Sequence, residues 1–128
     1  MGTSLRVLLV GESARAATEL AHELESGGFE PEVRRVATPR SFASALAPAP
    51  WDLVVCTVPS RRIGVVEALA ILRERDHDVP LVVLSETADT ALAAASIDAG
   101  ASDFLAREDL SRIGLVARRE LRRSAMGR

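Results

Sequence analysis

The stretch DLVVCTVPS (52–60) ends an apolar run with a hydroxyl side chain, Thr57, that has no acidic residue beside it. A hydroxyl becomes a nucleophile only when a neighbouring base takes its proton. His22 and His77 belong to other segments, and their spacing fits no metal site. We therefore expect no activated nucleophile at Thr57 and no metal ligands from the histidines. Other polar residues at or just after the ends of apolar runs are Glu12, Ser85 and Arg107.

Alternating segments predict how the chain positions these residues. The expected strands are 5–10, 30–36, 52–58, 79–85 and 102–106. Helical spacing predicts a first helix that begins after Ser13 and ends at Gly27, and a second over 38–47. The third helix is expected to place Val66, Leu69 and Leu72 on its inner face. Two further helices are expected over 87–99 and 109–123. Strict alternation of strands and helices with short connections predicts an α/β fold with a doubly wound parallel sheet.

The second expected strand, EPEVRRV (30–36), is polar and contains Pro31, which suits an edge of the sheet. An edge position there favours the strand order 2-1-3-4-5, in which ligands bind at the carboxyl ends of the first and third strands. The residues expected to line that crevice are Gly11, Glu12, Ser13, Thr57, Ser85 and Arg107.

Composition limits the kind of protein. The 128 residues are 48% hydrophobic and 27% charged, with a net charge of −2, which predicts one globular domain over 1–128 that does not bind nucleic acid. The expected core covers about 5–121, and 118–128 is a basic helical tail or the start of a linker. We expect a cytoplasmic protein without a membrane span or secretory signal. Its single cysteine, Cys56, excludes an internal disulfide and is expected in the core, with Trp51 covering the bottom of the sheet.

Three segments resemble response-regulator receiver domains, the CheY-like, flavodoxin-like class: EALAILRER (67–75), DVPLVVLSETAD (78–89) and DAGASDFLARED (98–109). The resemblance extends from Leu5 to about Leu121 and implies a three-layer fold with a phosphorylation pocket. That pocket has an acidic pair, an acceptor aspartate, a hydroxyl residue, a lysine and an aromatic switch residue. The positions in this chain that correspond to them are Gly11 and Glu12, Thr57, Ser85, Arg107 and Phe104.

The resemblance therefore implies a degenerate pocket without its acceptor. Glu12 is the one acid left, so we expect weak or absent Mg²⁺ binding and no other cofactor. Thr57 lacks both the charge of a carboxylate and a base. The predicted function is a non-enzymatic pseudo-receiver of a two-component or phosphorelay system that acts by protein–protein interaction. Two alternatives stay open: phosphorylation at Thr57 or Ser60 by a separate kinase, and a nucleotide-binding α/β domain, which GESARA (11–16) disfavours because it lacks a phosphate-binding glycine pattern.

Three crevice residues have two interpretations each. Arg107 either forms an ion pair with Glu12 or reflects a chain in which all 16 basic residues are arginine. Ser85 either keeps a switch role or, as we favour, caps the helix that begins near Thr87. Phe104 is either a residue locked in one buried rotamer or an ordinary core aromatic.

The resemblance implies signalling partners: a histidine kinase, an output domain or another regulator. Receivers usually communicate through helix 4, strand 5 and helix 5, which also suits a homodimer. The expected partner surface is Ala91, Ala94, Ala95, Arg107, Leu110, Ile113 and Ala117. The arginine-rich end, 117–128, is a solvated helix end, a surface for RNA or acidic membranes, or a helix that continues into another domain of a larger regulator or hybrid kinase.

Overall fold

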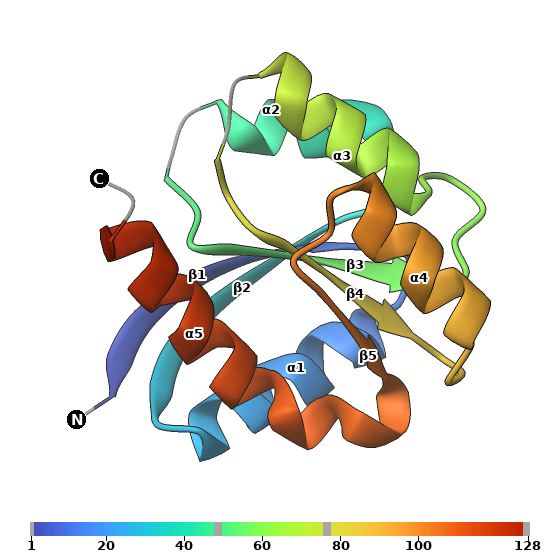
Figure 1. The fold of residues 1–128 in the computed structure, drawn as a ribbon. Helices are drawn as coiled ribbons and strands as arrows, with labels where there is room; N and C mark the ends of the chain where they lie inside the picture. Colours follow the sequence, from blue (N-terminus) through green and yellow to red (C-terminus); the bar gives the residue numbers. More distant parts are fainter. Residues whose placement is uncertain (1, 48–49, 76–77, 127–128) are drawn as a thin grey trace.

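A computed structural model describes residues 2–47, 50–75 and 78–126 and shows strands and helices in strict alternation (Figure 1). The strands are β1 (Thr3–Val10), β2 (Phe29–Val36), β3 (Leu53–Val58), β4 (Leu81–Ser85) and β5 (Asp103–Ala106). The helices are α1 (Ala14–Ser26), α2 (Pro39–Leu46), α3 (Val65–Glu74), α4 (Thr90–Ala99) and α5 (Ile113–Met126), with a 3₁₀ helix, η1 (Arg107–Arg112), before α5. All neighbouring strands are parallel, in the order β2-β1-β3-β4-β5. This topology confirms the predicted α/β fold and strand order.

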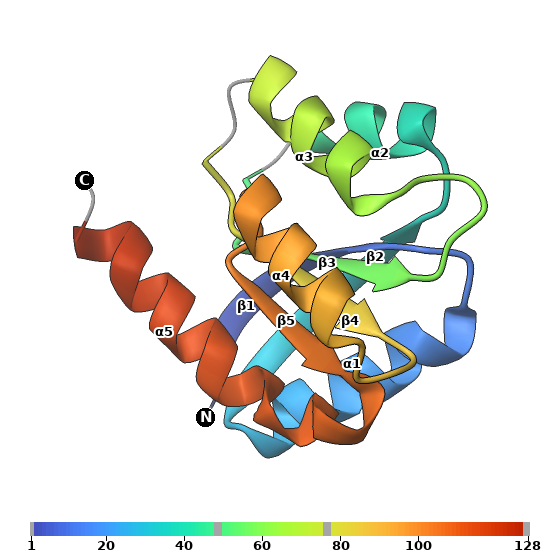
Figure 2. The same ribbon diagram turned by 45° about the vertical axis from the view of Figure 1, so that its right-hand side comes forward.

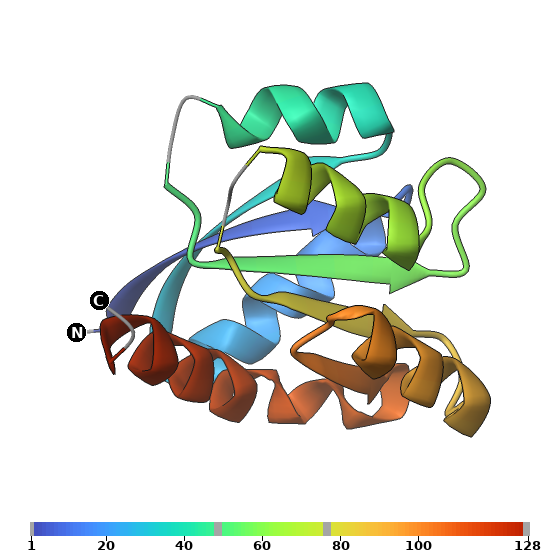
Figure 3. The same ribbon diagram turned by 45° about the horizontal axis from the view of Figure 1, so that its top comes forward.

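Helices cover both faces of the sheet and give three layers (Figures 2 and 3). On one face, α2 and α3 pack on β1, β3 and β4 through an apolar cluster that contains Phe42 and Leu72, and Leu92 of α4 packs against its margin. On the other face, α1, η1 and α5 form a second cluster with residues such as Leu20 and Ile113. Because the central strands are covered on both faces, their side chains are apolar almost without interruption.

Local sequence signals explain where several helices begin and end. The Ser13 hydroxyl accepts a hydrogen bond from the Ala16 amide and starts α1, which ends before Gly28, whose φ of +93° favours glycine. The predicted start of the fourth helix near Thr87 is wrong. Helix α4 begins at Thr90, because the Asp89 carboxylate accepts the Leu92 amide and supplies the cap.

The third helix places one residue differently from the prediction. Val66, which was expected on the inner face, is 68% exposed. Helix α3 begins after Gly64, and this phase turns Val65, Ala68, Leu69 and Leu72 toward the sheet instead. Val66 therefore lies on the surface beside the loop between β3 and α3.

The last part of the chain corrects the predicted partner surface. Leu110, Ile113 and Ala117 were expected there, but all three are buried in the cluster between α5 and the sheet. Their helical spacing places these three residues on the apolar inner face of η1 and α5, and this face packs against the sheet. The exposed large apolar side chains of α5 are Leu115 and Met126.

Helix α4 buries only one residue, Ser96, because its apolar residues are mostly alanines that are spread around the helix and form no single apolar face. Ala91, Ala94 and Ala95 are exposed, as a partner surface on this helix would require. No described helix is long and apolar enough to cross a membrane.

Two further expectations hold in the core. Cys56 is fully buried in β3, and burial raises the pKa of its thiol to about 12. The thiol is therefore protonated at neutral pH and cannot act as a redox-sensing thiolate. Trp51 is buried at the lower end of the sheet, where its indole N–H donates to the Ala45 carbonyl at 2.9 Å.

Candidate functional site

Strand register brings the predicted crevice residues to one edge of the sheet. Val10 is paired with Cys56, Val58 with Ser85, and Ser85 with Ala106. The residues that follow or end these strands therefore meet at the carboxyl edge, as expected for a parallel sheet. A cavity of about 110 Å³ opens there, lined by Glu12, Ser13, Ala16, Glu19, Thr57, Val58, Pro59, Leu84, Glu86, Arg107 and Leu110.

Thr57 is half-buried, and its hydroxyl is held by the neighbouring strand. The Thr57 Oγ1 donates to the Val10 carbonyl at 3.1 Å. A Cβ atom at position 11 would overlap this same Oγ1, so only glycine fits beside Thr57 in this arrangement. Gly11 and Thr57 are thus sterically matched: the hydroxyl occupies the space that a side chain at position 11 would need.

Glu12 lies in the loop between β1 and α1 and binds the loop between β3 and α3. Its carboxylate accepts the Ser60 hydroxyl at 3.1 Å and the Arg61 amide at 3.0 Å. The hydrogen bond from Ser60 is the main reason that the pKa of Glu12 lies below its ordinary value, and the charge of Arg62 adds to the effect. The described residues contain no group of three or more potential metal-binding side chains. Glu12 therefore serves as an acceptor between two loops and has no second carboxylate beside it at the ends of β1 and β3.

We predict that Ser60→Ala raises the pKa of Glu12 toward the ordinary glutamate value. Because the pKa of Glu12 is lower in the folded than in the unfolded state, the hydrogen bonds between its carboxylate and the loop of Ser60 stabilise the fold at pH values above the unfolded-state pKa. That contribution disappears as the pH falls through the folded-state pKa. Carboxyl-carbon NMR titration of both proteins measures the change, with Ser111→Ala on exposed η1 as a control. An unchanged Glu12 pKa in Ser60→Ala would contradict the assignment.

Arg107 does not form an ion pair with Glu12, which was the first of its two interpretations. Its guanidinium instead donates to both carboxylate oxygens of Glu19 at 2.9 Å and to Glu86 at 3.2 Å. These hydrogen bonds, that to Glu19 foremost, raise the pKa of Arg107 above its ordinary value. Both hydrogen bonds to Glu19 come from Nη2, whereas Nη1 donates to Glu86, so the two arms of the guanidinium hold two different carboxylates. Arg107 thereby links the end of β5 to α1 and to the segment after β4.

We expect Arg107→Gln to lower the thermal unfolding temperature slightly, with a smaller effect at high salt. The ion pairs are more than one-third exposed, so water and salt screen them. Unfolding measured at low and high salt tests this, with Arg122→Gln on the exposed face of α5 as the control. A loss that does not depend on salt would show that packing, rather than charge, explains the contribution of Arg107.

Ser85 is buried, and its hydroxyl accepts the Thr87 amide at 3.2 Å. The expectation that it caps the fourth helix is wrong, because Asp89 has that role. Ser85 instead shapes the turn that leaves β4. Phe104 is partly buried against the apolar cluster under α3 and α4, in contact with the core rather than at its centre.

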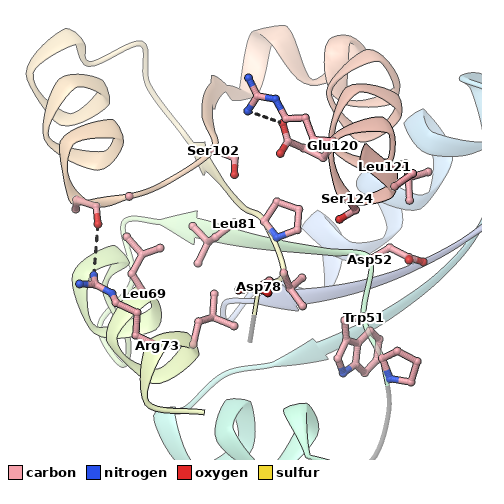
Figure 4. A pocket seen from close by; sticks show the side chains of 18 residues that line it. Trp51, Asp52, Leu69, Arg73, Asp78, Leu81, Ser102, Glu120, Leu121 and Ser124 are labelled. Carbon is pink, nitrogen blue, oxygen red and sulfur yellow. Dashed lines mark hydrogen bonds and ion pairs between the residues drawn. The ribbon is translucent and has the colours of Figure 1, made fainter. Parts of the chain in front are cut away.

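A larger cavity, of about 1080 Å³, lies at the opposite end of the sheet between α3 and α5 (Figure 4). Sequence reasoning gave no sign of it, because its lining comes from residues far apart in the chain. The buried Glu120 is its most unusual residue, and its carboxylate accepts the Arg119 guanidinium at 2.8 Å, with Arg123 at 3.5 Å. Trp51 and Leu69 add apolar surface. Glu120 is thus already paired with cations from its own helix.

Comparisons with known proteins agree with this fold. Over 108 residues the chain is 33% identical to the transcriptional regulatory protein PrrA of Mycobacterium tuberculosis, covering 82% of this chain and 44% of PrrA. It is 32% identical to the photosynthetic apparatus regulatory protein RegA of Rhodovulum sulfidophilum, covering 84% of this chain and 57% of RegA. The chain thus spans about half the length of these relatives. No family model matches it.

Among solved structures, the receiver domain of a putative LuxO repressor protein from Vibrio parahaemolyticus superposes with a TM-score of 0.81 at 19% identity. That match covers 97% of this chain and 95% of the other. The receiver domain of Francisella response regulator 1452 superposes with a TM-score of 0.78 at 16% identity, covering 94% and 98%. Fold and sequence together define this chain as a CheY-like receiver domain of the response-regulator class, a type of signalling module that is generally not an enzyme.

Proposed function

We propose that this receiver domain does not accept a phosphoryl group and signals through protein–protein contact. One observation carries the proposal: the Thr57 hydroxyl, at the position that the resemblance assigns to the acceptor, donates to Val10 and fills the space beside Gly11. Neither position supplies the carboxylate that the resemblance to receivers implies there. Glu19 and Glu86 also line the cavity, but both are paired with Arg107.

The missing carboxylates bear directly on phosphoryl transfer. The reaction depends on positioning and on neutralising charge with Mg²⁺, which prefers one or two carboxylates together with water and phosphate oxygens. Glu12 alone, already bound to Ser60 and Arg61, is a poor site for that ion. Among the described residues, the Thr57 hydroxyl is hydrogen-bonded to the Val10 carbonyl and to no base. Each few kcal/mol of lost transition-state stabilisation slows a reaction by roughly a hundredfold.

The relatives support a signalling protein as the partner of this domain. PrrA and RegA are named as regulatory proteins and are longer than the matched region. We propose that this domain works with a histidine kinase, an output domain or another regulator. Ala91, Ala94 and Ala95 on α4, beside β5, leave room for close approach of a partner or of a second copy.

The test exposes the protein to acetyl phosphate with Mg²⁺, and separately to beryllofluoride with Mg²⁺. We expect no mass increase and no specific amide shifts at Gly11, Thr57 or Ser85. A phosphoryl adduct on Thr57, or beryllofluoride-dependent shifts at these three residues, would overturn the proposal. Glu12→Gln is the matched control, since any shift caused by Mg²⁺ at Glu12 must disappear in it.

Intact mass of the protein from its native cells tests the alternative of a separate kinase. A phosphoryl group on Ser60 would favour that alternative, because its hydroxyl lies at the surface of the crevice, bound to Glu12. We expect the unmodified mass.

Melting temperature in the presence of ATP or GTP tests the nucleotide-binding alternative, and we expect no increase.

A further inference from the structure

The arrangement of charges around the crevice differs sharply between its two halves. Over the ends of β4 and β5 the exposed residues are mostly acidic, including Glu86, Asp89, Glu108 and Asp109. Over the ends of β2, β1 and β3 they are mostly basic. We call the basic half the arginine face and define it as Arg35, Arg40, Arg61 and Arg62.

Hydrogen bonds hold Arg35 and Arg61 against the loop that carries Glu12. Arg35, at the end of β2, donates to the carbonyls of Gly11 at 3.3 Å and Glu12 at 3.4 Å. The Glu12 carboxylate in turn accepts the amide of Arg61. Arg62 is close enough to Glu12 to affect its pKa. Arginines of two segments that are distant in sequence, the end of β2 and the loop between β3 and α3, therefore lie beside the loop that carries Glu12, and Arg40 stands in the first turn of α2.

These arginines are not neutralised within the domain. All four are exposed, and none belongs to an ion pair among residues 2–47, 50–75 and 78–126. Glu12 is the nearby carboxylate, and Gly11 and Thr57 add no negative charge beside it. The local charge is thus positive, although the whole chain carries −2. A local excess of one sign attracts a ligand of the opposite sign and speeds its encounter.

Apolar surface lies within the same region. Val66, 68% exposed, stands in the first turn of α3, directly after the loop that carries Arg61 and Arg62. Pro59 is exposed at the start of that loop, which projects beyond the sheet in Figure 3. Arginine together with exposed apolar side chains is typical of surfaces that bind protein.

We propose that the arginine face, with Val66 and Pro59, binds an acidic protein segment that also carries apolar side chains. The apolar residues favour a protein over a nucleic acid, whose phosphates would leave them uncovered. The acidic half of the same edge also disfavours a long polyanion, because its backbone would extend over Glu86 and Asp89. This inference rests on the proposed function, signalling by protein contact, and specifies the face and the chemistry of the partner.

The experiment uses three fluorescent probes of equal charge: a short peptide of glutamates with two leucines, an all-glutamate peptide and a DNA duplex. We expect the leucine-containing peptide to bind most tightly and to shift the amides of Arg35, Arg61, Arg62 and Val66. Tighter binding of the DNA would overturn the proposal in favour of a nucleic-acid surface. Absence of saturable binding by the leucine-containing peptide would also overturn it.

Two variants locate the binding. Arg61→Ser/Arg62→Ser should weaken the leucine-containing peptide by about threefold to tenfold, the size expected for two exposed charge contacts. Arg112→Ser/Arg122→Ser removes the same charge from exposed positions elsewhere and should change the affinity by less than about twofold. Equal losses in the two variants would show a general charge effect and contradict the proposal.

Val66→Ser tests the apolar part separately. It should weaken the leucine-containing peptide by roughly threefold or more while leaving the all-glutamate peptide unchanged. An equal effect on both peptides would contradict a role for apolar contact. Failure of the peptide experiments and acceptance of a phosphoryl group at Thr57 are separate results, so the two proposals can fail independently.

Discussion

Gly11→Asp/Thr57→Asp should give this domain the Mg²⁺-dependent phosphoryl-accepting site that, under the proposed function, the natural chain lacks. The two positions face each other at the ends of β1 and β3, so the variant places two new carboxylates beside Glu12. Carboxylates and water are the ligands that Mg²⁺ uses, and the aspartate at position 57 is already an anion at neutral pH. We expect the rate of adduct formation with acetyl phosphate to rise by about a thousandfold or more.

Intact mass against time measures this gain, and NMR titration with Mg²⁺ measures the affinity for the ion. Gly11→Asp/Thr57→Asn is the matched control, which retains one added carboxylate but no acceptor and should form no adduct. Gly11→Asp alone should be destabilised, because its Cβ overlaps Thr57 Oγ1. If the double aspartate variant folds but gains no affinity for Mg²⁺, the lack of carboxylates is not what disables the crevice.

Gly11→Ser should destabilise the fold by about 1–3 kcal/mol, the usual cost of forcing extra atoms into a packed region. The new Cβ displaces the Thr57 hydroxyl, and because Thr57 is β-branched, only the rotamer that turns its Cβ hydrogen toward position 11 keeps both branches away from the new atom. The hydrogen bond to Val10 is lost at the same time. Urea unfolding measures the free-energy difference.

A double-mutant cycle isolates the contact between the two residues. Thr57→Ala should cost about 1 kcal/mol for the lost hydrogen bond, and Gly11→Ser/Thr57→Ala should be less destabilised than the sum of the single variants. Gly64→Ser is the matched control: a Cβ there meets no atom within 4 Å, and serine is a good residue at the start of a helix. Strict additivity would show that the steric match at the crevice has no energetic consequence.

Several features of the domain follow from the sequence alone. Alternation of apolar strands and periodic helices is a local pattern, and it predicts the parallel sheet because each strand must be covered on both faces. The polar second strand with Pro31 predicts the edge position and thus the strand order. The order places Gly11, Thr57 and Ser85 at one edge, and the resemblance to receivers assigns the acceptor position to Thr57, so the sequence predicts a pocket without an acceptor carboxylate.

Contacts between distant side chains were decided only by the tertiary structure. Arg107 binds Glu19 and Glu86, although Glu12 was the partner considered from sequence. Helical spacing identified the stripe through Ile113 correctly, but whether such a stripe meets the sheet or a partner depends on how the helix is docked.

The same limit applies to the crevice and the arginine face. The steric match of Gly11 with Thr57 depends on the separation of β1 and β3, and the arginine face forms because the end of β2 and the loop between β3 and α3 both meet the loop of Glu12. Sequence periodicity records which side of an element is buried. It contains no information on which of several charged groups will lie within reach once the elements are packed.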